Sequence, residues 1–351
     1  MPSLKILHLV RMWPQSGNPQ YGSFIQKHID AIGREGLEQS VLVLDSLDVH
    51  ETDHGIPVRA IQAPSGPKGW LSKYKQVEEW MESWGTPDIV HAHGGSADTA
   101  NIFLRLHMHH GHRIRRVVTE HGSQWIRGAS RGARWTLRLA HARTAVSPYL
   151  AEIMSKTAQT TCIPNIIESS QHDPQRESSG PRHFLNVSDC VDYTKGLSEL
   201  LDAWKQHSTT YPNDTLSLVG DGPDRESIAQ KARSLNNVNI LGSQVPHEVY
   251  ETMSRHHALV VNSRWETFSM VIGEALERGL EVICTPIPGP KSVYSDYPVS
   301  FRQGSTEAVD DLANSLAQTN HGQAPVKMDE FRSSQIARKF TSMYQGLYRR
   351  R

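Results

Sequence analysis

The sequence predicts an α/β protein built from two doubly wound, Rossmann-like domains with a cleft between them, and three observations support this class. The chain has 351 residues, which is long for one domain and comfortable for two. Short apolar runs alternate with longer amphipathic stretches, a pattern typical of βαβ units and a parallel sheet. The alternation stops at a polar segment near the middle of the chain and then begins again.

The first round of alternation predicts an N-terminal domain over residues 1–167. The stretch Phe24–Ile32 has apolar residues near helical spacing and predicts the helix after the first strand. Residues 168–182 are polar, carry no periodicity and predict a linker. The strands of this domain are expected at Lys5–Val10, Val41–Leu44, Asp88–His93, Arg116–Thr119, Thr144–Ser147 and Thr161–Pro164.

The second round predicts a C-terminal α/β domain over residues 183–330. Residues 331–351 include the amphipathic stretch Ser333–Tyr348, so we expect a final helix, which can pack back on the N-terminal domain. The strands of the second domain are expected at His183–Val187, Leu216–Val219, Val238–Leu241, Ala258–Val261 and Val282–Cys284.

Composition and charge exclude several classes of function. The chain has 37 basic and 37 acidic residues, so it offers no global charge for a polyanion. The three cysteines are far apart and form neither a metal spacing nor a disulfide framework, which fits a reducing compartment. No stretch reaches the roughly 20 apolar residues of a membrane span, and the N-terminus lacks a signal-peptide pattern. We therefore expect a cytoplasmic protein.

The most informative motif is a pair of glutamates, Glu266 and Glu274, near the junction of a strand and a helix. Glu266 follows the apolar run Ala258–Val261, so it is expected on the loop at the carboxyl end of a buried strand, with Glu274 on the following helix. Ligands of open α/β sheets bind at this edge. Carboxylates accept hydrogen bonds from the vicinal hydroxyls of a sugar or a ribose. A surface glutamate that complements the helix dipole is the alternative.

Two other loops of the second domain have features of an anion site. Gly220 and Gly222 lie between a strand and a helix, where backbone N–H groups can approach a phosphate or nucleoside. An ordinary tight turn is the alternative. Lys195 and Gly196 lie at the predicted start of a helix, where a lysine is favourable if an anionic ligand binds at the same end. A solvated surface lysine is the alternative there.

These motifs together resemble the glycosyltransferase family 4 group of retaining GT-B enzymes. The resemblance covers most of the chain and is strongest from about 183 to 290. It rests on Lys195-Gly196, Val219–Pro223, Ser263–Phe268, Glu274–Leu276, Gly279 and Val282–Thr285.

The resemblance implies a nucleotide-sugar donor on the C-terminal domain and no cofactor. Lys195 would neutralise the donor diphosphate, and Glu274 would hold the ribose diol. The sugar and its phosphate would lie against Glu266 and Thr267 and the backbone of Phe268, Ser269 and Met270, close to Gly220 and Gly222. The implied reaction transfers a hexosyl unit, with retention, to a glycan, lipid-linked or small-molecule acceptor in polysaccharide or glycolipid synthesis. The leaving phosphate would take the acceptor's proton.

The chain departs from the family pattern at several positions. The arginine that usually precedes the Lys-Gly pair is missing from the stretch Val187–Asp192. Ser269 replaces a usual glycine, Glu277 a small residue and Glu281 a usual proline. These departures keep open a non-catalytic relative that binds sugars or scaffolds polysaccharide assembly. A nucleotide-sugar epimerase or a sugar phosphorylase of the same fold is a further alternative, although no pyridoxal phosphate lysine motif is found.

In the first domain the resemblance points to loops that follow the strands. Tyr21 and Gly22, in the loop Asn18–Phe24, would face the donor phosphate and the acceptor, and a plain βα loop is the alternative. His121 would be the residue nearest to sugar transfer, since an imidazole can both donate and accept. His93 would lie on the acceptor side.

His91 and His93 share one face of a predicted strand, so a metal pair is conceivable. No third ligand is evident from the sequence and no Asp-rich metal motif is found, so we expect no metal. A packed His91 and a His93 near the cleft are favoured instead. Lys195 and helix N-termini would then stabilise the charge on the leaving diphosphate.

A basic stretch in the first domain has no acidic residue from Gly122 to Ala151. Arg127, Arg131, Arg134 and Arg138 are spaced by four, three and four, so they are expected on one helical face. Such a face attracts an anionic membrane surface or a pyrophosphate-linked acceptor, which predicts peripheral contact with the inner face of a membrane. A solvated basic helix is the alternative. Nucleic acid is disfavoured because no recognition module is present.

Overall fold

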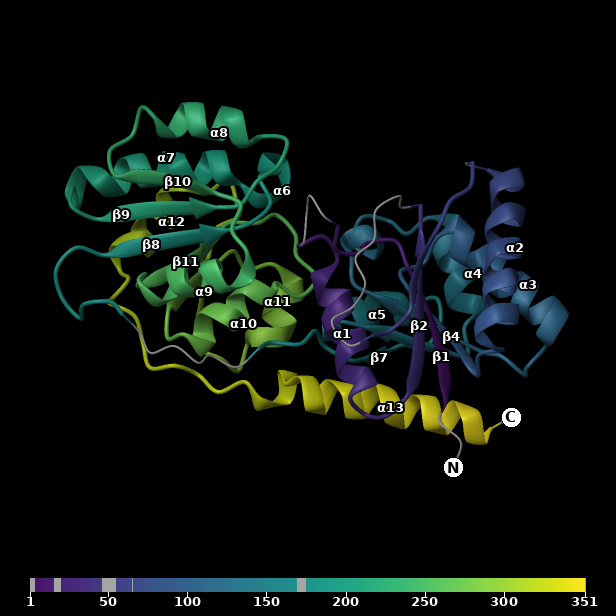
Figure 1. Ribbon diagram of the computed structural model, residues 1–351. Helices are drawn as coiled ribbons and strands as arrows, with labels where there is room; N and C mark the ends of the chain where they lie inside the picture. The colour runs from purple at the N-terminus through teal and green to yellow at the C-terminus, as the bar shows by residue number, and fades with distance from the viewer. Residues whose placement is uncertain (1–3, 16–19, 46–54, 65, 169–174, 351) are drawn as a thin grey trace. The chain divides into compact units, whose positions relative to one another are not determined.

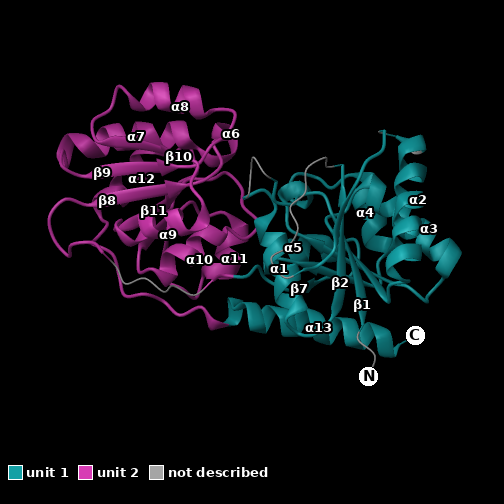
Figure 2. Ribbon diagram, in the orientation of Figure 1, with its two compact units in different colours: residues 1–166, 330–351 teal, residues 167–329 magenta. Residues whose placement is uncertain are grey.

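The computed structural model describes residues 4–15, 20–45, 55–64, 66–168 and 175–350. The chain divides into two compact units, shown in Figure 2. Unit 1 comprises Met1–Ile166 and Glu330–Arg351, and unit 2 comprises Ile167–Asp329. Each unit is built on its own parallel sheet, so the predicted pair of doubly wound α/β sheets is confirmed.

Unit 1 contains a seven-stranded sheet of order β3-β2-β1-β4-β5-β6-β7, in which all neighbours are parallel. The strand order reverses between β1 and β4, and ligands of such sheets bind beyond the carboxyl ends of the strands at this point. The strands are β1 (Lys5–Val10), β2 (Glu38–Leu44), β3 (Val58–Ile61), β4 (Ile89–His93), β5 (Arg115–Glu120), β6 (Ala142–Ala145) and β7 (Thr161–Cys162).

The helices of unit 1 include the last helix of the chain, α13 (Ser333–Arg349), which packs beside α1 (Ser23–Gly33) in Figure 1. Ile336, Phe340 and Tyr344 recur every four residues on one face of α13 and are fully buried against the sheet. The final helix therefore supplies core residues to the unit in which the chain begins. The other helices are α2 (Pro67–Trp84), α3 (Ala97–His110), α4 (Arg131–Leu139), α5 (Pro148–Ser155) and the 3₁₀ turn η1 (Ser123–Trp125).

Unit 2 contains a six-stranded parallel sheet of order β10-β9-β8-β11-β12-β13, whose order reverses between β8 and β11. Phe184, Trp204 and Leu216 lie in its main apolar core. The strands are β8 (His183–Val187), β9 (Thr215–Val219), β10 (Val238–Gly242), β11 (Ala258–Val261), β12 (Glu281–Cys284) and β13 (Val299–Phe301). The helices are α6 (Asp192–Lys195), α7 (Leu197–Thr210), α8 (Arg225–Ala232), α9 (Pro246–Ser254), α10 (Met270–Glu277), α11 (Pro288–Tyr294) and α12 (Val309–Ala317), and η2 (Asp329–Phe331) precedes α13.

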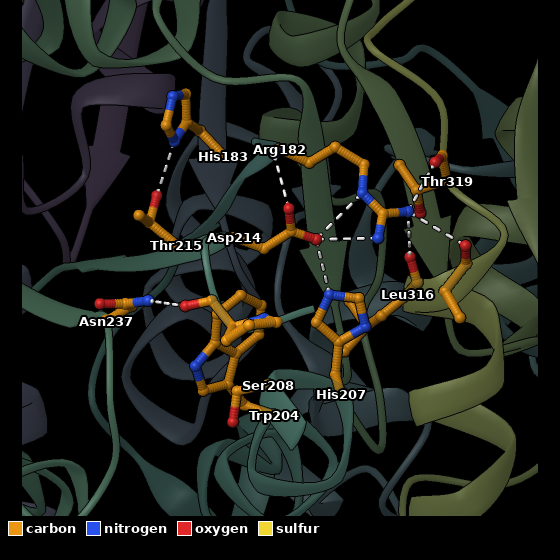
Figure 3. A network of polar contacts seen from close by, with 12 residues as sticks. Arg182, His183, Trp204, His207, Ser208, Asp214, Thr215, Asn237, Leu316 and Thr319 are labelled. Atoms are coloured by element: carbon orange, nitrogen blue, oxygen red, sulfur yellow. Dashed lines mark hydrogen bonds and ion pairs between the residues drawn. The ribbon is translucent and has the colours of Figure 1, made fainter. Parts of the chain in front are cut away.

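A buried ion pair closes the amino edge of the unit 2 sheet (Figure 3). Arg182 lies 2.8 Å from Asp214, and the two residues directly precede β8 and β9. Arg182 also donates to the carbonyls of Leu316, in the last turn of α12, and of Thr319, just after it, and His207 lies 2.9 Å from Asp214. This network fastens three elements at the edge opposite to the carboxyl ends of the strands, where the predicted site lies.

Some element predictions are corrected by the structure. Strands β3 and β13 were not expected, because they are short sheet-edge strands whose residues are mostly half-exposed and lack an apolar run. The last strand of unit 1 ends at Cys162 rather than Pro164. Of the predicted linker, residues 169–174 lie outside the described residues, and Arg176 donates to the Arg278 carbonyl, so part of this polar stretch is bound to unit 2. Among the described residues, no helix is both long enough and apolar enough to cross a bilayer.

Candidate functional site

Lys195 and Glu266, far apart in the sequence, meet at the carboxyl edge of the unit 2 sheet. The Lys195 Nζ atom donates to Glu266 Oε1 at 2.7 Å and lies 3.1 Å from Asp189 Oδ1. These residues follow β8 and β11, the two strands at which the sheet order reverses. The position is therefore the one at which a doubly wound sheet binds its ligand.

The prediction that Lys195 begins a long helix is wrong. Lys195 ends the four-residue helix α6, and Gly196 separates it from α7 in a left-handed conformation with φ of 59°. A Cβ atom at Gly196 would also lie 2.6 Å from the Asn262 carbonyl oxygen. Glycine is thus required here by backbone shape and by space. The tight junction directs the lysine side chain toward Glu266.

The electrostatics of the pair depend on its partial burial. Only 16% of the Lys195 side chain and 17% of the Glu266 side chain are exposed, whereas Asp189 is 60% exposed. Burial disfavours the lysine charge, but the two carboxylates outweigh it and hold the pKa of Lys195 above its ordinary value. Lys195 is therefore a fixed cation. An arriving anion would compete mainly with Asp189, the more exposed partner.

The loop from Glu266 to α10 is held in a conformation that aims a helix N-terminus at this edge. Ser263 donates to Glu266 Oε1 at 3.0 Å. Ser269 caps α10 with φ of 61°, a left-handed conformation that favours glycine, the residue expected here from the family pattern. Phe268 is buried, and Tyr294 donates to the Ser269 carbonyl at 3.1 Å. The first backbone N–H groups of α10, which begins at Met270, have no acceptor within the helix and suit an anion.

Glu274 belongs to a separate group of contacts on α10. Its Oε1 atom accepts a hydrogen bond from the Tyr250 hydroxyl at 3.2 Å. The Arg278 guanidinium lies 3.7 Å from the centre of the Tyr250 ring and donates to the Glu274 carbonyl. Tyr250 comes from α9, so the carboxylate is oriented before any ligand binds. Thr267 lies between Glu266 and Phe268 on the loop described above.

Gly220 and Gly222 have a structural function that the sequence did not indicate. A Cβ atom at Gly220 would collide with the Ser188 carbonyl, and one at Gly222 would lie 2.8 Å from the Cys190 backbone. Cys190 N–H in turn donates to the Asp221 carbonyl at 3.0 Å. The glycines therefore allow the loop after β9 to pack directly on the loop after β8. This contact positions the loop that carries Asp189.

Two of the departures from the family pattern hold the segment before α13. Glu277 is buried and accepts a hydrogen bond from the Met328 backbone at 2.8 Å. Glu281 accepts one from the Asn320 backbone at 3.2 Å. Both acids thus have structural partners of their own.

Unit 1 has a pocket of about 580 Å³ at the carboxyl edge of its sheet. The ends of β4 and β5 and the loops after β1, β4 and β5 line it, and its lining includes Arg11, His93, Glu120, His121 and Gln124. Glu120 is buried and accepts hydrogen bonds from Gly95 N–H at 2.6 Å and from Gln124 at 2.8 Å. Burial outweighs these bonds and raises the pKa of Glu120 to about 7. The predicted acceptor-side residues His93 and His121 therefore meet at one pocket.

The structure places a third histidine, which was not evident from the sequence, beside His91 and His93. His8 lies opposite His91 in the register of β1 and β4, and ring nitrogens of all three lie within 4.8 Å of one another. The strand register, which the sequence does not give, brings them together. His91 uses both nitrogens in hydrogen bonds, to Tyr344 at 2.6 Å and to Thr119 at 2.7 Å. A metal would have to displace these bonds.

The first predicted loop of unit 1 is described only from residue 20, so Asn18 and Pro19 lie outside the described residues. Gly22 caps α1 with φ of 74°, and a Cβ atom there would collide with the Met12 backbone. Gly22 therefore permits close approach of the protein's own chain. Tyr21 is 40% exposed.

The predicted stripe of four arginines on one helix is corrected. Helix α4 begins at Arg131, so Arg127 precedes it and does not share its face. Arg131, Arg134 and Arg138 are exposed on α4, and Trp135 beside them is 56% exposed. We call these four residues the α4 face.

Comparison with known proteins agrees with the two α/β units described above. Residues 23–171 match the family described as Glycosyltransferase Family 4, and residues 168–331 match the family described as Glycosyl transferases group 1. The two matches together run from residue 23 to residue 331 and include every strand of both sheets except β1. The chain is a GT-B glycosyltransferase of the family 4 type.

Individual relatives of this glycosyltransferase are distant. The phosphatidylinositol N-acetylglucosaminyltransferase gpi3 subunit of Schizosaccharomyces pombe is 30% identical over 166 residues, which cover 45% of this chain but only 35% of that protein. TuaC of Bacillus subtilis, a glycosyltransferase provisionally named for teichuronic acid biosynthesis, is 24% identical over 91% of this chain and 90% of its own length. The solved apo structure of the lipopolysaccharide outer core galactosyltransferase WaaB has the same fold, with a TM-score of 0.76, 18% identity and coverage of 98% and 99%.

Proposed function

We propose that this glycosyltransferase moves a hexosyl unit from a nucleoside-diphosphate sugar to a glycan, lipid-linked or small-molecule acceptor, with retention at the anomeric carbon and without a metal ion. The observation that carries the proposal is the ion pair of Lys195 with Glu266 at the carboxyl edge of unit 2, beside the N-terminus of α10. A fixed cation and a helix N-terminus suit a diphosphate, and a carboxylate suits sugar hydroxyls.

The donor would bind with its diphosphate at Lys195 and at the backbone of Phe268, Ser269 and Met270. Its sugar would lie at Glu266 and Thr267, and its ribose diol at Glu274. In the reaction the bond from the anomeric carbon to the phosphate oxygen breaks and a bond to the acceptor oxygen forms on the same face. The leaving phosphate takes the acceptor's proton, and Lys195 stabilises the negative charge that develops there.

The acceptor would bind at the unit 1 pocket. His93, His121 and Glu120 supply polar groups at its wall, and Tyr21 and Gly22 lie on a loop of the same unit. The name of gpi3 refers to phosphatidylinositol and that of TuaC to teichuronic acid biosynthesis, which supports a glycan or lipid-linked acceptor here. Transfer requires the two bound substrates to meet.

A non-catalytic sugar-binding relative is a second candidate, and Asp189 is the observation that favours it. The Asp189 carboxylate forms an ion pair with Lys195 and would compete with a donor diphosphate for this cation. A thermal-shift panel of nucleotide sugars followed by a turnover assay decides between the two candidates. Release of nucleoside diphosphate that depends on acceptor supports transfer, whereas binding without turnover supports the second candidate. Isomerised donor formed without acceptor would indicate an epimerase.

The ribose assignment has its own test. The Glu274→Ala variant should bind the best nucleotide sugar of the panel more weakly in calorimetry, because the diol loses its acceptor. Unchanged binding would make the assignment wrong.

We also propose that the α4 face touches an anionic membrane. Three exposed arginines attract negative headgroups, and an exposed tryptophan beside them suits the interface between water and lipid. Such contact would bring the enzyme to a lipid-linked acceptor.

A further inference from the structure

A chain of three buried histidines leads from the interior of unit 1 to the pocket. Gln39 Oε1 lies 2.8 Å from His8 Nε2, and His8 Nδ1 lies 3.2 Å from His93 Nε2. His93 Nδ1 lies 3.1 Å from His121 Nε2, and His121 Nδ1 lies 3.3 Å from Asn165 Oδ1. We call His8, His93 and His121 the histidine chain. All three are less than a tenth exposed.

The direction of hydrogen bonding in this chain is set at one end. The Gln39 amide nitrogen donates to the Ile29 carbonyl at 3.0 Å, so its oxygen must face His8. An oxygen only accepts, and His8 must therefore carry its proton on Nε2. Its Nδ1 atom then accepts, which requires a proton on Nε2 of His93. A neutral His93 protonated on Nε2 has a bare Nδ1 atom, which must accept from His121 Nε2. His121 therefore also carries its proton on Nε2.

The far end of the chain does not impose a direction. The oxygen and nitrogen of an asparagine amide exchange places when the group turns over, so Asn165 can either donate or accept. The partners joined by these hydrogen bonds include no carboxylate. Burial also lowers the pKa of His8 and of His121 to about 4, which keeps both neutral near pH 7.

We infer that Gln39, acting through His8 and His93, fixes His121 as the tautomer protonated on Nε2, so that its Nδ1 atom accepts but does not donate a hydrogen bond. With the Asn165 amide turned over so that its nitrogen faces His121, this ring nitrogen accepts from it, and it is suited to accept instead from the hydroxyl of a bound sugar. Gln39, His8 and His93 are thus positioning residues for His121. The consequence for transfer rests on the proposed function, but the tautomer itself does not.

The tautomer is tested by NMR on protein labelled with ¹⁵N in histidine. Long-range ¹H–¹⁵N spectra separate protonated from unprotonated ring nitrogens, and the His121 signals are identified by their loss in His121→Gln. Wild-type His121 should show a protonated Nε2 and an unprotonated Nδ1. In Gln39→Met a proton on His8 Nε2 would be a buried donor without an acceptor, which is rarer and costlier than a bare ring nitrogen. The direction of the chain should therefore reverse, with the proton of His121 on Nδ1 and the Asn165 oxygen as its acceptor.

Two further variants make the test independent of one substitution. Asn165→Leu should leave the proton of His121 on Nε2, because Gln39 still sets the direction. The matched control Tyr344→Phe removes a buried hydrogen bond of His91 outside the histidine chain and should change the signals of His91 alone. A wild-type His121 protonated on Nδ1, an unchanged tautomer in folded Gln39→Met, or a switched tautomer in Asn165→Leu would overturn the inference.

The catalytic consequence is measured separately. Gln39→Met should lower kcat for transfer by at least about tenfold and leave the donor KM within about twofold, because only the group that orients a hydroxyl is altered. A switched tautomer with unchanged kcat would overturn the positioning role. If the wild-type protein transfers no sugar, the NMR comparison still decides the tautomer, so failure of the proposed function is distinguished from failure of this inference.

Discussion

Replacement of Lys195 by methionine tests the donor site most directly, because it removes the charge and keeps most of the side-chain length. The amine is mostly buried and lies 2.7 Å from Glu266, so its charge is less screened than that of a surface lysine. A hydrogen bond to a charged group contributes about 1.5–3 kcal/mol. At about 1.4 kcal/mol for each factor of ten, the donor Kd should rise about 10- to 150-fold.

The same substitution also affects folding, and the two effects can be separated. Lys195→Met leaves the Glu266 carboxylate without its cation, which should lower the free energy of unfolding by about 1–3 kcal/mol. The double variant Lys195→Met/Glu266→Gln removes the unpaired charge. It should recover part of the stability but none of the affinity for the diphosphate.

The assay is calorimetric titration with the nucleoside diphosphate that most raises the melting temperature of the wild-type protein. Lys5→Met is the matched control, because Lys5 is paired with Glu38 at 2.9 Å in unit 1, whereas the donor site belongs to unit 2. It should leave the Kd unchanged. If folded Lys195→Met binds the diphosphate within twofold of wild type, the lysine does not hold the donor and the reasoning fails.

Three other predictions follow from the structure. Ser269→Gly should raise the free energy of unfolding by about 0.5–1 kcal/mol in urea denaturation, because relief of a left-handed serine, about 1–2 kcal/mol, exceeds the entropic cost of glycine; a decrease would mean that Ser269 is not strained. The depressed pKa values of the histidine chain should make unit 1 lose stability as the pH falls from about 6.5 toward 4, at up to about 1.4 kcal/mol per pH unit for each histidine. Glu120, whose pKa is raised, gains a proton more readily in the folded protein and so opposes this loss. Glu120→Gln should therefore make the free energy of unfolding fall more steeply with decreasing pH, as measured by denaturation curves at several pH values. An unaltered dependence on pH would contradict the raised pKa of Glu120. Arg131→Glu/Arg134→Glu should reduce sedimentation with anionic vesicles and leave neutral vesicles unaffected, and equal sedimentation would remove the membrane proposal.

The sheets and the donor loop were predictable because their signals are local. Buried parallel strands such as Ala258–Val261 are continuous apolar runs, and Glu266 follows one of them directly. The edge strands Val58–Ile61 and Val299–Phe301 escaped detection because they lack such a run. Their place in the sheet comes from pairing with a neighbour.

The groupings within the site were harder to predict because they depend on strand register and on contacts between loops. His8 meets His91 only because β1 and β4 are neighbours, which no spacing in the sequence reveals. Asp189 reaches Lys195 because the loop after β8 rests on the glycines after β9. Arg127 was assigned to a helix because its spacing is helical, but the chain begins α4 only at Arg131, after the Ser130 cap.

The position of α13 has a consequence for synthesis on the ribosome. Unit 1 lacks Ile336, Phe340 and Tyr344 until the ribosome has translated all of unit 2, residues 167–329. At about 5–20 residues per second, that delay is roughly ten to thirty seconds. During this time the nascent N-terminal half exposes the apolar face that α13 covers in the folded protein. Synthesis therefore begins with unit 1 but completes it last, so unit 1 is the part that should need a chaperone.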